Sequence, residues 1–183
     1  MSWTIDSAHT SINFSVRHMM ISNVHGRFEN VEGTVDFNQE NPEESNIDVK
    51  IDASSINTRE PQRDDHLHSP DFLDVEKYPY ILFKSTHIEK TGPSTGKVFG
   101  DLTIHGVSRQ IELDVEYSGQ AKSPFGTTSA GFTASTQINR KDWGLGWNVA
   151  LETGGWLVGD EIKVNIEVEI IKQEAAEKQQ VSN

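Results

Sequence analysis

The regular part of the chain ends with the segment DEIKVNIEVEIIK, residues 160–172. Ile or Val occupies every second position from Ile162 to Ile170, and Glu, Lys or Asn occupies the positions between. An extended strand puts alternate side chains on opposite faces, whereas a helix would spread them around its circumference. The segment is therefore predicted to be a β-strand of about 30 Å, at roughly 3.3 Å per residue. Its apolar face requires a curved surface to cover it.

The same alternation recurs upstream in seven further runs, at residues 12–16, 28–37, 47–53, 81–85, 98–104, 111–117 and 130–138. Within the run 28–37 the phase shifts near Asn30, which predicts a β-bulge there. Turn sequences such as Asn41-Pro42 and His105-Gly106 separate the runs. About eight one-sided strands in series predict an all-β fold, either a barrel or a sandwich. An elongated antiparallel barrel is favoured, because strands this long would leave exposed edges in a sandwich.

Two segments interrupt the series of strands. Residues 57–74 are rich in Arg, Asp, His and Pro, and the stretch Arg63–His68 before Ser69-Pro70 predicts a short helical insert near residues 60–70. Residues 139–159 hold three tryptophans among five glycines, which predicts an irregular Trp/Gly-rich segment. Residues 1–172 are thus expected to form one barrel domain. The polar tail, residues 173–183, is expected to be disordered.

Composition narrows the classes of partner. The chain has 183 residues, with 16 Lys plus Arg against 28 Asp plus Glu, a net charge of −12. This sign argues against nucleic acid, and against an anionic membrane surface, as the main partner. The absence of cysteine excludes disulfides, thiolate metal sites and a cysteine nucleophile. No stretch is long enough to be an integral membrane segment, and the start at Met1 does not resemble a secretory signal, so a cytoplasmic location is expected.

Catalytic and metal-binding patterns are weak. His66 and His68 lie beside Asp64 and Asp65, but residues two apart on a helix do not face each other, so no metal site is expected. No nucleophile elbow and no phosphate-binding glycine loop occur, so no catalytic residue and no cofactor are predicted. The inward side chains of a barrel can either fill the lumen or line a cavity for one small ligand, and both alternatives stay open. A long apolar lumen would suit a chain-like lipid, since each buried methylene contributes about 0.8 kcal/mol.

A set of short motifs follows one another along most of the chain: Asp6-x-x-His9-x-Ser11, Phe14-x-Val16-x-His18, Gly26-Arg-Phe28, Arg63-Asp-x-His66-Leu-x-Ser69, Tyr78-Pro79-x-Ile81-x-Phe83 and Asn139-Arg140-x-Asp142-Trp143-Gly144. In order and spacing they resemble the YceI-like family, from Trp3 to about Ile170. The resemblance implies a lipocalin-like barrel that holds a polyisoprenoid or a similar amphiphile, such as an isoprenoid quinone, in its lumen. Without a signal peptide, the chain is similar to the cytoplasmic branch of that family.

The resemblance also suggests binding residues. Arg63, His66, Asn139 and Arg140 lie in the two interruptions, where the mouth of a barrel is expected, and we hypothesise that they orient the polar head group of the ligand. The alternative is that they tie the two inserts to the rim of the barrel. The residues expected to contact the apolar part of the ligand in the lumen are Phe14, Val16, Phe28, Val35, Phe83, Leu102, Leu113, Phe132 and Trp143.

The function predicted from these observations is a non-enzymatic binding or carrier protein for a hydrophobic small molecule. A polyisoprenoid, an isoprenoid quinone or a fatty amide would serve as the ligand. The rival prediction is an enzyme that acts on a lipid-like substrate around His66 and His18. A third is a stress-response barrel whose packed core binds nothing. A homodimer through exposed strands is left open.

Overall fold

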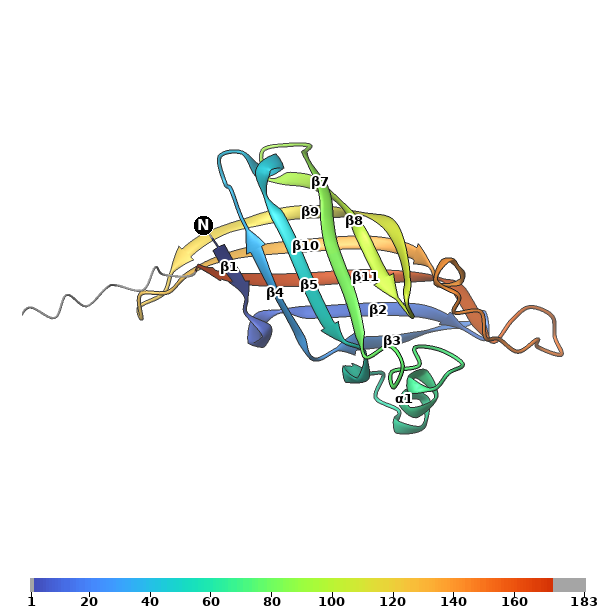
Figure 1. Ribbon diagram of the computed structural model, residues 1–183. Helices are drawn as coiled ribbons and strands as arrows, with labels where there is room; N and C mark the ends of the chain where they lie inside the picture. Colours follow the sequence, from blue (N-terminus) through green and yellow to red (C-terminus); the bar gives the residue numbers. More distant parts are fainter. Residues whose placement is uncertain (1, 173–183) are drawn as a thin grey trace, which may run out of the picture.

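The structure, a computed structural model, describes residues 2–172, and the expected disordered tail at 173–183 lies outside the described residues. Eleven antiparallel strands form one sheet within this range (Figure 1). Their bounds are β1 Ser2–Ile5, β2 Ser11–His18, β3 Ser22–Phe28, β4 Val31–Asp36, β5 Asn46–Asp52, β6 Ile56–Asn57, β7 Tyr80–Lys90, β8 Thr95–Ile104, β9 Val107–Lys122, β10 Thr128–Asn139 and β11 Val158–Lys172.

Eight of these strands close into a ring. The order β1-β4-β5-β7-β8-β9-β10-β11 returns to its start because β11 also pairs with β1. The remaining strands extend the wall beyond β11, with β2 on β11, β3 on β2 and β6 on β3. The all-β prediction of an elongated antiparallel barrel of about eight strands is confirmed. In Figure 1 the long strands β9, β10 and β11 run along the molecule, and β4, β5 and β7 cross them obliquely.

The segment that decided the fold, β11, pairs with three neighbours. Its last residues pair with β1, where Ile170 faces Ile5, and the rest of its length pairs with β2, where Val164 faces Phe14. On its other edge it pairs with β10 from Glu161 to Ile171. A short 3₁₀ turn, η1 (Ser7–His9), separates β1 from β2. Because η1 separates β1 from β2, these two short strands pair one after the other along the same edge of the long strand β11.

The predicted bulge near Asn30 is wrong. Residues 28–37 form two strands that part at Glu29 and Asn30, and β3 pairs with β2 while β4 pairs with β1 and β5. The amides of Glu29 and Asn30 both donate to Ser55 Oγ, at 3.1 Å, instead of to a neighbouring strand. The shift in phase therefore marks a strand boundary. The register shifts elsewhere, where Ser118 of β9 is unpaired opposite Gly131/Phe132 and where Thr86 of β7 is unpaired between Ser85 and His87.

Both interruptions have the predicted character. The helix α1 (Pro61–His68) ends where Ser69 donates its amide to the His66 carbonyl, 3.1 Å away. Within residues 2–172 no helix is long and apolar enough to span a membrane. Residues 139–159 contain one 3₁₀ turn, η4 (Arg140–Trp143), and one isolated bridge between Ala150 and Trp156. Figure 1 shows α1 below one end of the barrel and the 139–159 segment extending from that same end.

The apolar core of the barrel forms three clusters of buried residues. Near the start of the chain, Trp3, Val35, Ala130 and Ile170 pack together with aromatic rings from neighbouring strands. Toward α1, a larger cluster includes Ile12, Ile51, Ile81, Ile138 and Trp143. A third cluster on β7 and β8 consists of Phe83, Ile88 and Val98.

Candidate functional site

A cavity of about 610 Å³ occupies the interior of the barrel. This volume lies in the range of roughly 300–1,000 Å³ that is usual for small-molecule sites. Its wall includes the alternating apolar face of β11, namely Ile162, Val164, Ile166, Val168 and Ile170. The choice left open by the sequence, between a filled lumen and a cavity, is thereby decided for the cavity.

Two glycines in the wall make room for aromatic rings. An added Cβ at Gly26 would come within 2.3 Å of Phe14 Cζ, and one at Gly100 within 2.5 Å of Phe83 Cζ. Each phenyl ring therefore lies over a glycine of the next strand and covers its backbone. Small inward residues thus accommodate rings laid along the wall, and the space in the centre stays open.

The apolar residues predicted to line the lumen fall into two groups. All of them except Trp143 line the cavity, namely Phe14, Val16, Phe28, Val35, Phe83, Leu102, Leu113 and Phe132. Trp143 is fully buried in the adjoining core, and its Nε1 donates to the Leu102 carbonyl at 2.9 Å. It supports the wall at Leu102 from behind.

The four polar residues predicted at the mouth also separate. Arg63, His66 and Arg140 line the cavity, whereas Asn139 does not. The side chain of Asn139 accepts the amide of Lys141, at 3.0 Å, and so caps the 3₁₀ turn η4. The structure thus brings three of the four predicted head-group residues to one cavity.

Arg140 is occupied by its own segment. Its Nε donates to the Gly159 carbonyl at 2.8 Å, and its Nη1 donates to the carbonyls of Leu145 and of Trp147, the latter at 3.0 Å. Its Nη2 reaches the Val158 carbonyl at 3.5 Å. Only 2% of the residue is exposed, and this burial lowers the pKa of the guanidinium while Asp160 opposes the shift. These bonds hold the irregular segment in place and leave little capacity for a ligand.

Arg63 makes fewer bonds. Its Nε donates to Thr58 Oγ1 at 2.9 Å and its Nη2 to the Thr58 carbonyl at 2.8 Å. The Thr58 hydroxyl is held in turn by Asp64 Oδ1, 2.5 Å away. Both bonds of Arg63 use Nε and Nη2, so within residues 2–172 Nη1 is the guanidinium nitrogen left for a further acceptor. Arg63 is therefore positioned by α1 and its flank while one of its donors remains available.

His66 joins the two interruptions. Its Nε2 lies 2.9 Å from Asp71 Oδ2, and its ring meets those of Phe72 and Trp147 edge-on, with centroids 5.1 and 4.5 Å apart. Trp147, which sequence reasoning did not assign to the site, lines the cavity as well. Its alternation with Leu145 and Val149 was a signal, but the surrounding glycines concealed it. His18, the partner of His66 in the rival enzymatic prediction, is a further lining residue.

A lone hydroxyl lies in the aromatic cluster at the other end of the cavity. Tyr117 lines the cavity, and its ring packs against Phe37 and Phe132 with centroids 5.7 and 5.2 Å away. Its oxygen is buried and has no hydrogen-bond partner among the described residues. The rings of Tyr117, Phe37 and Phe132 thus form an aromatic part of the cavity wall.

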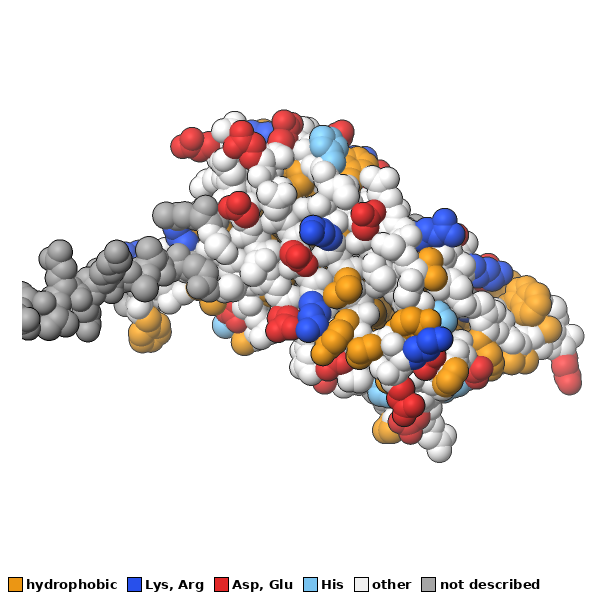
Figure 2. All heavy atoms as spheres, viewed as in Figure 1, with side chains coloured by type: hydrophobic (Ala, Val, Ile, Leu, Met, Phe, Trp, Pro, Cys, Tyr) orange, Lys and Arg blue, Asp and Glu red, His pale blue; other side chains and the backbone are white. Residues whose placement is uncertain are grey.

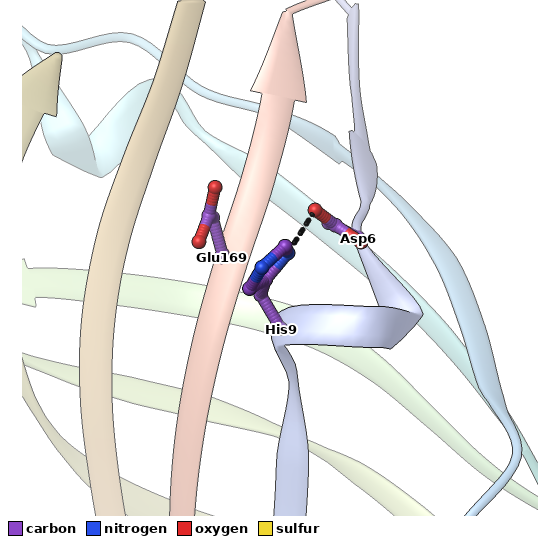
Figure 3. A group of neighbouring side chains, drawn as sticks. All are labelled: Asp6, His9 and Glu169. Carbon is purple, nitrogen blue, oxygen red and sulfur yellow. Dashed lines mark hydrogen bonds and ion pairs between the residues drawn. The ribbon is translucent and has the colours of Figure 1, made fainter. Parts of the chain in front are cut away.

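One further cluster of potential ligands lies outside the cavity lining. Asp6, His9 and Glu169 offer atoms that all lie within 4.8 Å of one another. Figure 3 shows these three side chains near one another beside β11. Asp6 Oδ2 is 2.7 Å from His9 Nδ1, and this bond raises the pKa of His9. The ion pair bridges the two ends of η1, the turn that separates β1 from β2.

Comparison with known proteins covers nearly the whole of the described chain. Residues 3–170 match the family described as YceI-like domain. The chain belongs to the YceI-like family. The resemblance found in the motifs is thereby confirmed. A relative from Pseudomonas savastanoi pv. phaseolicola, named UPF0312 protein, is 39% identical over 140 residues, which are 76% of this chain and 73% of the relative.

Solved structures agree with this assignment. The YceI protein of Campylobacter jejuni superposes with a TM-score of 0.73 at 37% identity, covering 92% of this chain and 96% of that one. A domain from Saccharophagus degradans, described as polyisoprenoid binding, superposes with a TM-score of 0.66 and covers 93% of this chain and 98% of its own. At 13% identity this second likeness shows the fold alone. The barrel is the fold of the YceI-like family.

Proposed function

We propose that the protein is a non-enzymatic binding and carrier protein for one long-chain amphiphilic lipid, such as a polyisoprenoid, an isoprenoid quinone or a fatty amide. The observation that carries the proposal is the apolar cavity of about 610 Å³ enclosed by the strands. Transfer of a hydrocarbon chain from water into such a space is favourable by about 0.8 kcal/mol for each methylene. The description of the Saccharophagus degradans domain as polyisoprenoid binding supports this class of ligand.

The polar head group, in this proposal, lies against Arg63 and His66. Both belong to α1 and line the cavity, and the bonds of Arg63 to Thr58 do not use its Nη1. We assign Asn139 and Arg140 a supporting role instead, because their polar atoms bind backbone groups of residues 141–159. The apolar tail would lie along the rings of Phe14, Phe28 and Phe83.

A titration with a fluorescent polyprenyl or quinone analogue tests the proposal. We expect saturation at one ligand per chain, and we expect native mass spectrometry of protein purified from its host to show one bound lipid. Removal of that lipid should lower the melting temperature, because a ligand that binds only the folded state stabilises it by mass action.

A matched pair of variants shows whether the lumen is the site. Ala134 of β10 lines the cavity, and the next residue, Ser135, is exposed on the outer face. Ala134→Trp should fill the lumen and reduce affinity more than tenfold, whereas Ser135→Trp should leave affinity unchanged. Equal affinities for the two variants would contradict binding in the lumen.

The cytoplasmic location and the homodimer remain predictions. Cell fractionation tests the location, and light scattering tests the homodimer.

A further inference from the structure

The hairpin between β2 and β3 presents three large apolar side chains to water. Met19, Met20 and Ile21 form its tip, and all three are exposed, with Ile21 at 77%. Residues at a hairpin tip are usually polar, because they make no contact with the core. The apolar character of this tip thus has no role in packing the barrel.

The backbone of this tip makes the choice of residues more unusual. Met19 and Met20 have φ of +50° and +64°, and the turn is closed where Ile21 donates its amide to the His18 carbonyl at 3.2 Å. Turns with two successive positive φ values favour Asn and Gly, since a Cβ is disfavoured in the left-handed region. Two methionines at these positions give up local stability. Strain held at an exposed apolar tip is an indication of function.

A second hairpin, closed by the bridge between Ala150 and Trp156, lies against the first. Met19 donates its amide to the Leu157 carbonyl at 2.8 Å, and Met20 Sδ lies so close to Gly155 that a Cβ there would be 1.9 Å away. Val149 and Trp156 on this second hairpin are also exposed. We call the surface of Met19, Met20, Ile21, Val149 and Trp156 the apolar rim. Figure 2 shows hydrophobic side chains gathered at the end of the molecule to which the 139–159 segment belongs.

The apolar rim is continuous with the cavity. The residues that adjoin it along the chain, His18 before the first hairpin tip and Leu157 and Val158 after the second, line the cavity wall. The rim therefore adjoins the wall of the same cavity. A lipid with a long hydrocarbon chain partitions into bilayers and barely dissolves in water, so an exposed apolar surface that adjoins the cavity wall is suited to contact with a bilayer.

We propose that the apolar rim docks on the surface of a lipid bilayer and inserts Met19, Met20, Ile21 and Trp156 at the level of the head groups. The ligand would then pass between bilayer and cavity without crossing water, and this inference rests on the proposed function. Trp and long apolar side chains are suited to that depth. A net charge of −12 opposes anionic lipid, so the apolar contact carries the affinity and neutral phosphatidylcholine should suffice.

Co-sedimentation with phosphatidylcholine vesicles tests the docking. The double variant Met19→Asn/Met20→Gly puts preferred residues at the two positive φ positions while removing the apolar side chains. We expect its partition to vesicles to fall about tenfold or more, because such binding scales with buried apolar area. Its melting temperature should stay the same or rise, which separates the loss of binding from misfolding.

A distant exposed aromatic residue provides the matched control. Phe125 is 94% exposed in the turn between β9 and β10, at the opposite end of β10 from residues 139–159. Phe125→Ser should therefore leave the partition to vesicles unchanged. In the unmodified protein, vesicles should shift tryptophan emission to the blue, and Trp156→Phe should remove most of that shift.

Three outcomes would overturn the docking proposal. The first is that the unmodified protein does not partition to vesicles. The second is that the double variant partitions to them as strongly as the unmodified protein. The third is that the unmodified protein forms a dimer, which the double variant does not, and that neither protein binds vesicles. The proposed function fails separately, if the unmodified protein does not bind the fluorescent analogue supplied in ethanol. With both correct, the double variant should bind that analogue with unchanged affinity but acquire it from vesicles about tenfold more slowly.

Discussion

The two segments that interrupt the strands both bring an arginine to the cavity, and the two arginines differ in how many of their donors are used. Arg140 donates to carbonyls of Leu145, Trp147 and Gly159 and is buried. Arg63 donates to one residue, Thr58, and is half-buried. Arg140 therefore stabilises the fold of its own segment. In the described part of the chain, Arg63 retains a free donor, which points to a role in binding a ligand.

The difference follows from the backbone of each segment. At the end of α1 the carbonyls of His66, Leu67 and His68 accept the backbone amides of Ser69, Leu73 and Val75, so they need no side-chain donor. Between Gly144 and Leu157 there is little regular structure, so buried carbonyls there need other donors. A guanidinium has five N–H groups in a fixed plane and can serve several carbonyls at once. An arginine in a family motif is therefore better assigned from the backbone around it than from its charge.

The largest predicted effect is that of Arg140→Ala. It leaves the carbonyls of Leu145, Trp147 and Gly159 without their donor, and each buried unpaired group costs about 1–3 kcal/mol. We expect the free energy of unfolding, measured with urea, to fall by about 3–5 kcal/mol. Arg140→Lys should recover little, since one ammonium cannot replace the planar fork. A loss below about 1 kcal/mol would contradict the structural role.

Arg63→Ala should have the opposite profile. Removal of one charge-assisted bond to the ligand should weaken the binding of the fluorescent polyprenyl or quinone analogue about tenfold, or about 1.4 kcal/mol. The free energy of unfolding should fall by about 1–3 kcal/mol, less than for Arg140→Ala, because one buried carbonyl, that of Thr58, loses this donor. Arg27→Ala is the control, because Arg27 pairs with Glu29 on an exposed face and should leave binding unchanged. Unchanged affinity in Arg63→Ala would remove it from the head-group site.

A smaller effect concerns the contact between the two segments. His66 and Trp147 meet edge-on at 4.5 Å. A double-mutant cycle with His66→Ala and Trp147→Ala should give a coupling of about 0.5–1.5 kcal/mol in unfolding. Additive losses, within about 0.3 kcal/mol, would mean that the segments fold against the barrel independently.

The smallest effect lies outside both segments. The bond to Asp6 raises the pKa of His9 above its usual 6.5. A raised pKa means that the protonated form is favoured in the folded state. Its contribution to stability is complete below pH 6.5 and is lost as the pH rises through the folded pKa. The melting temperature should therefore fall slightly across that interval, and His9→Gln should abolish this slope.

The sequence predicted the strands wherever alternation was long enough to detect. It missed β1 and β6, which are too short to show a pattern, and most of β3. In β3 the inward position opposite Phe14 is Gly26, because the phenyl ring occupies the space of a side chain, and the apolar pattern is broken there. A search for apolar residues at every second position therefore misses a strand whose inward position is a glycine covered by an aromatic ring of the neighbouring strand.

Alternation also predicted the cavity lining on the strands. It did not predict the arrangement of residues 139–159, where the chain is irregular. Residues such as Val164 and Phe132 follow from alternation alone, whereas Trp143 lies in a 3₁₀ turn where that period does not apply. Which carbonyls occupy Arg140 depends on the path of residues 144–159, which no local pattern specifies. The positive φ values of Met19 and Met20 also contradict residue preference and could not be anticipated.

Closure of the ring has a consequence for biosynthesis. The ring closes where β1, at residues 3–5, meets β11 at residues 170–172, so nearly the full length of the described chain separates the partners. On the ribosome, β1 emerges long before β11, so the edge of β1 that pairs with β11 stays unpaired during most of translation. Until β11 has emerged, one edge of β1 and one edge of β10 lack the partner that they have in the closed ring.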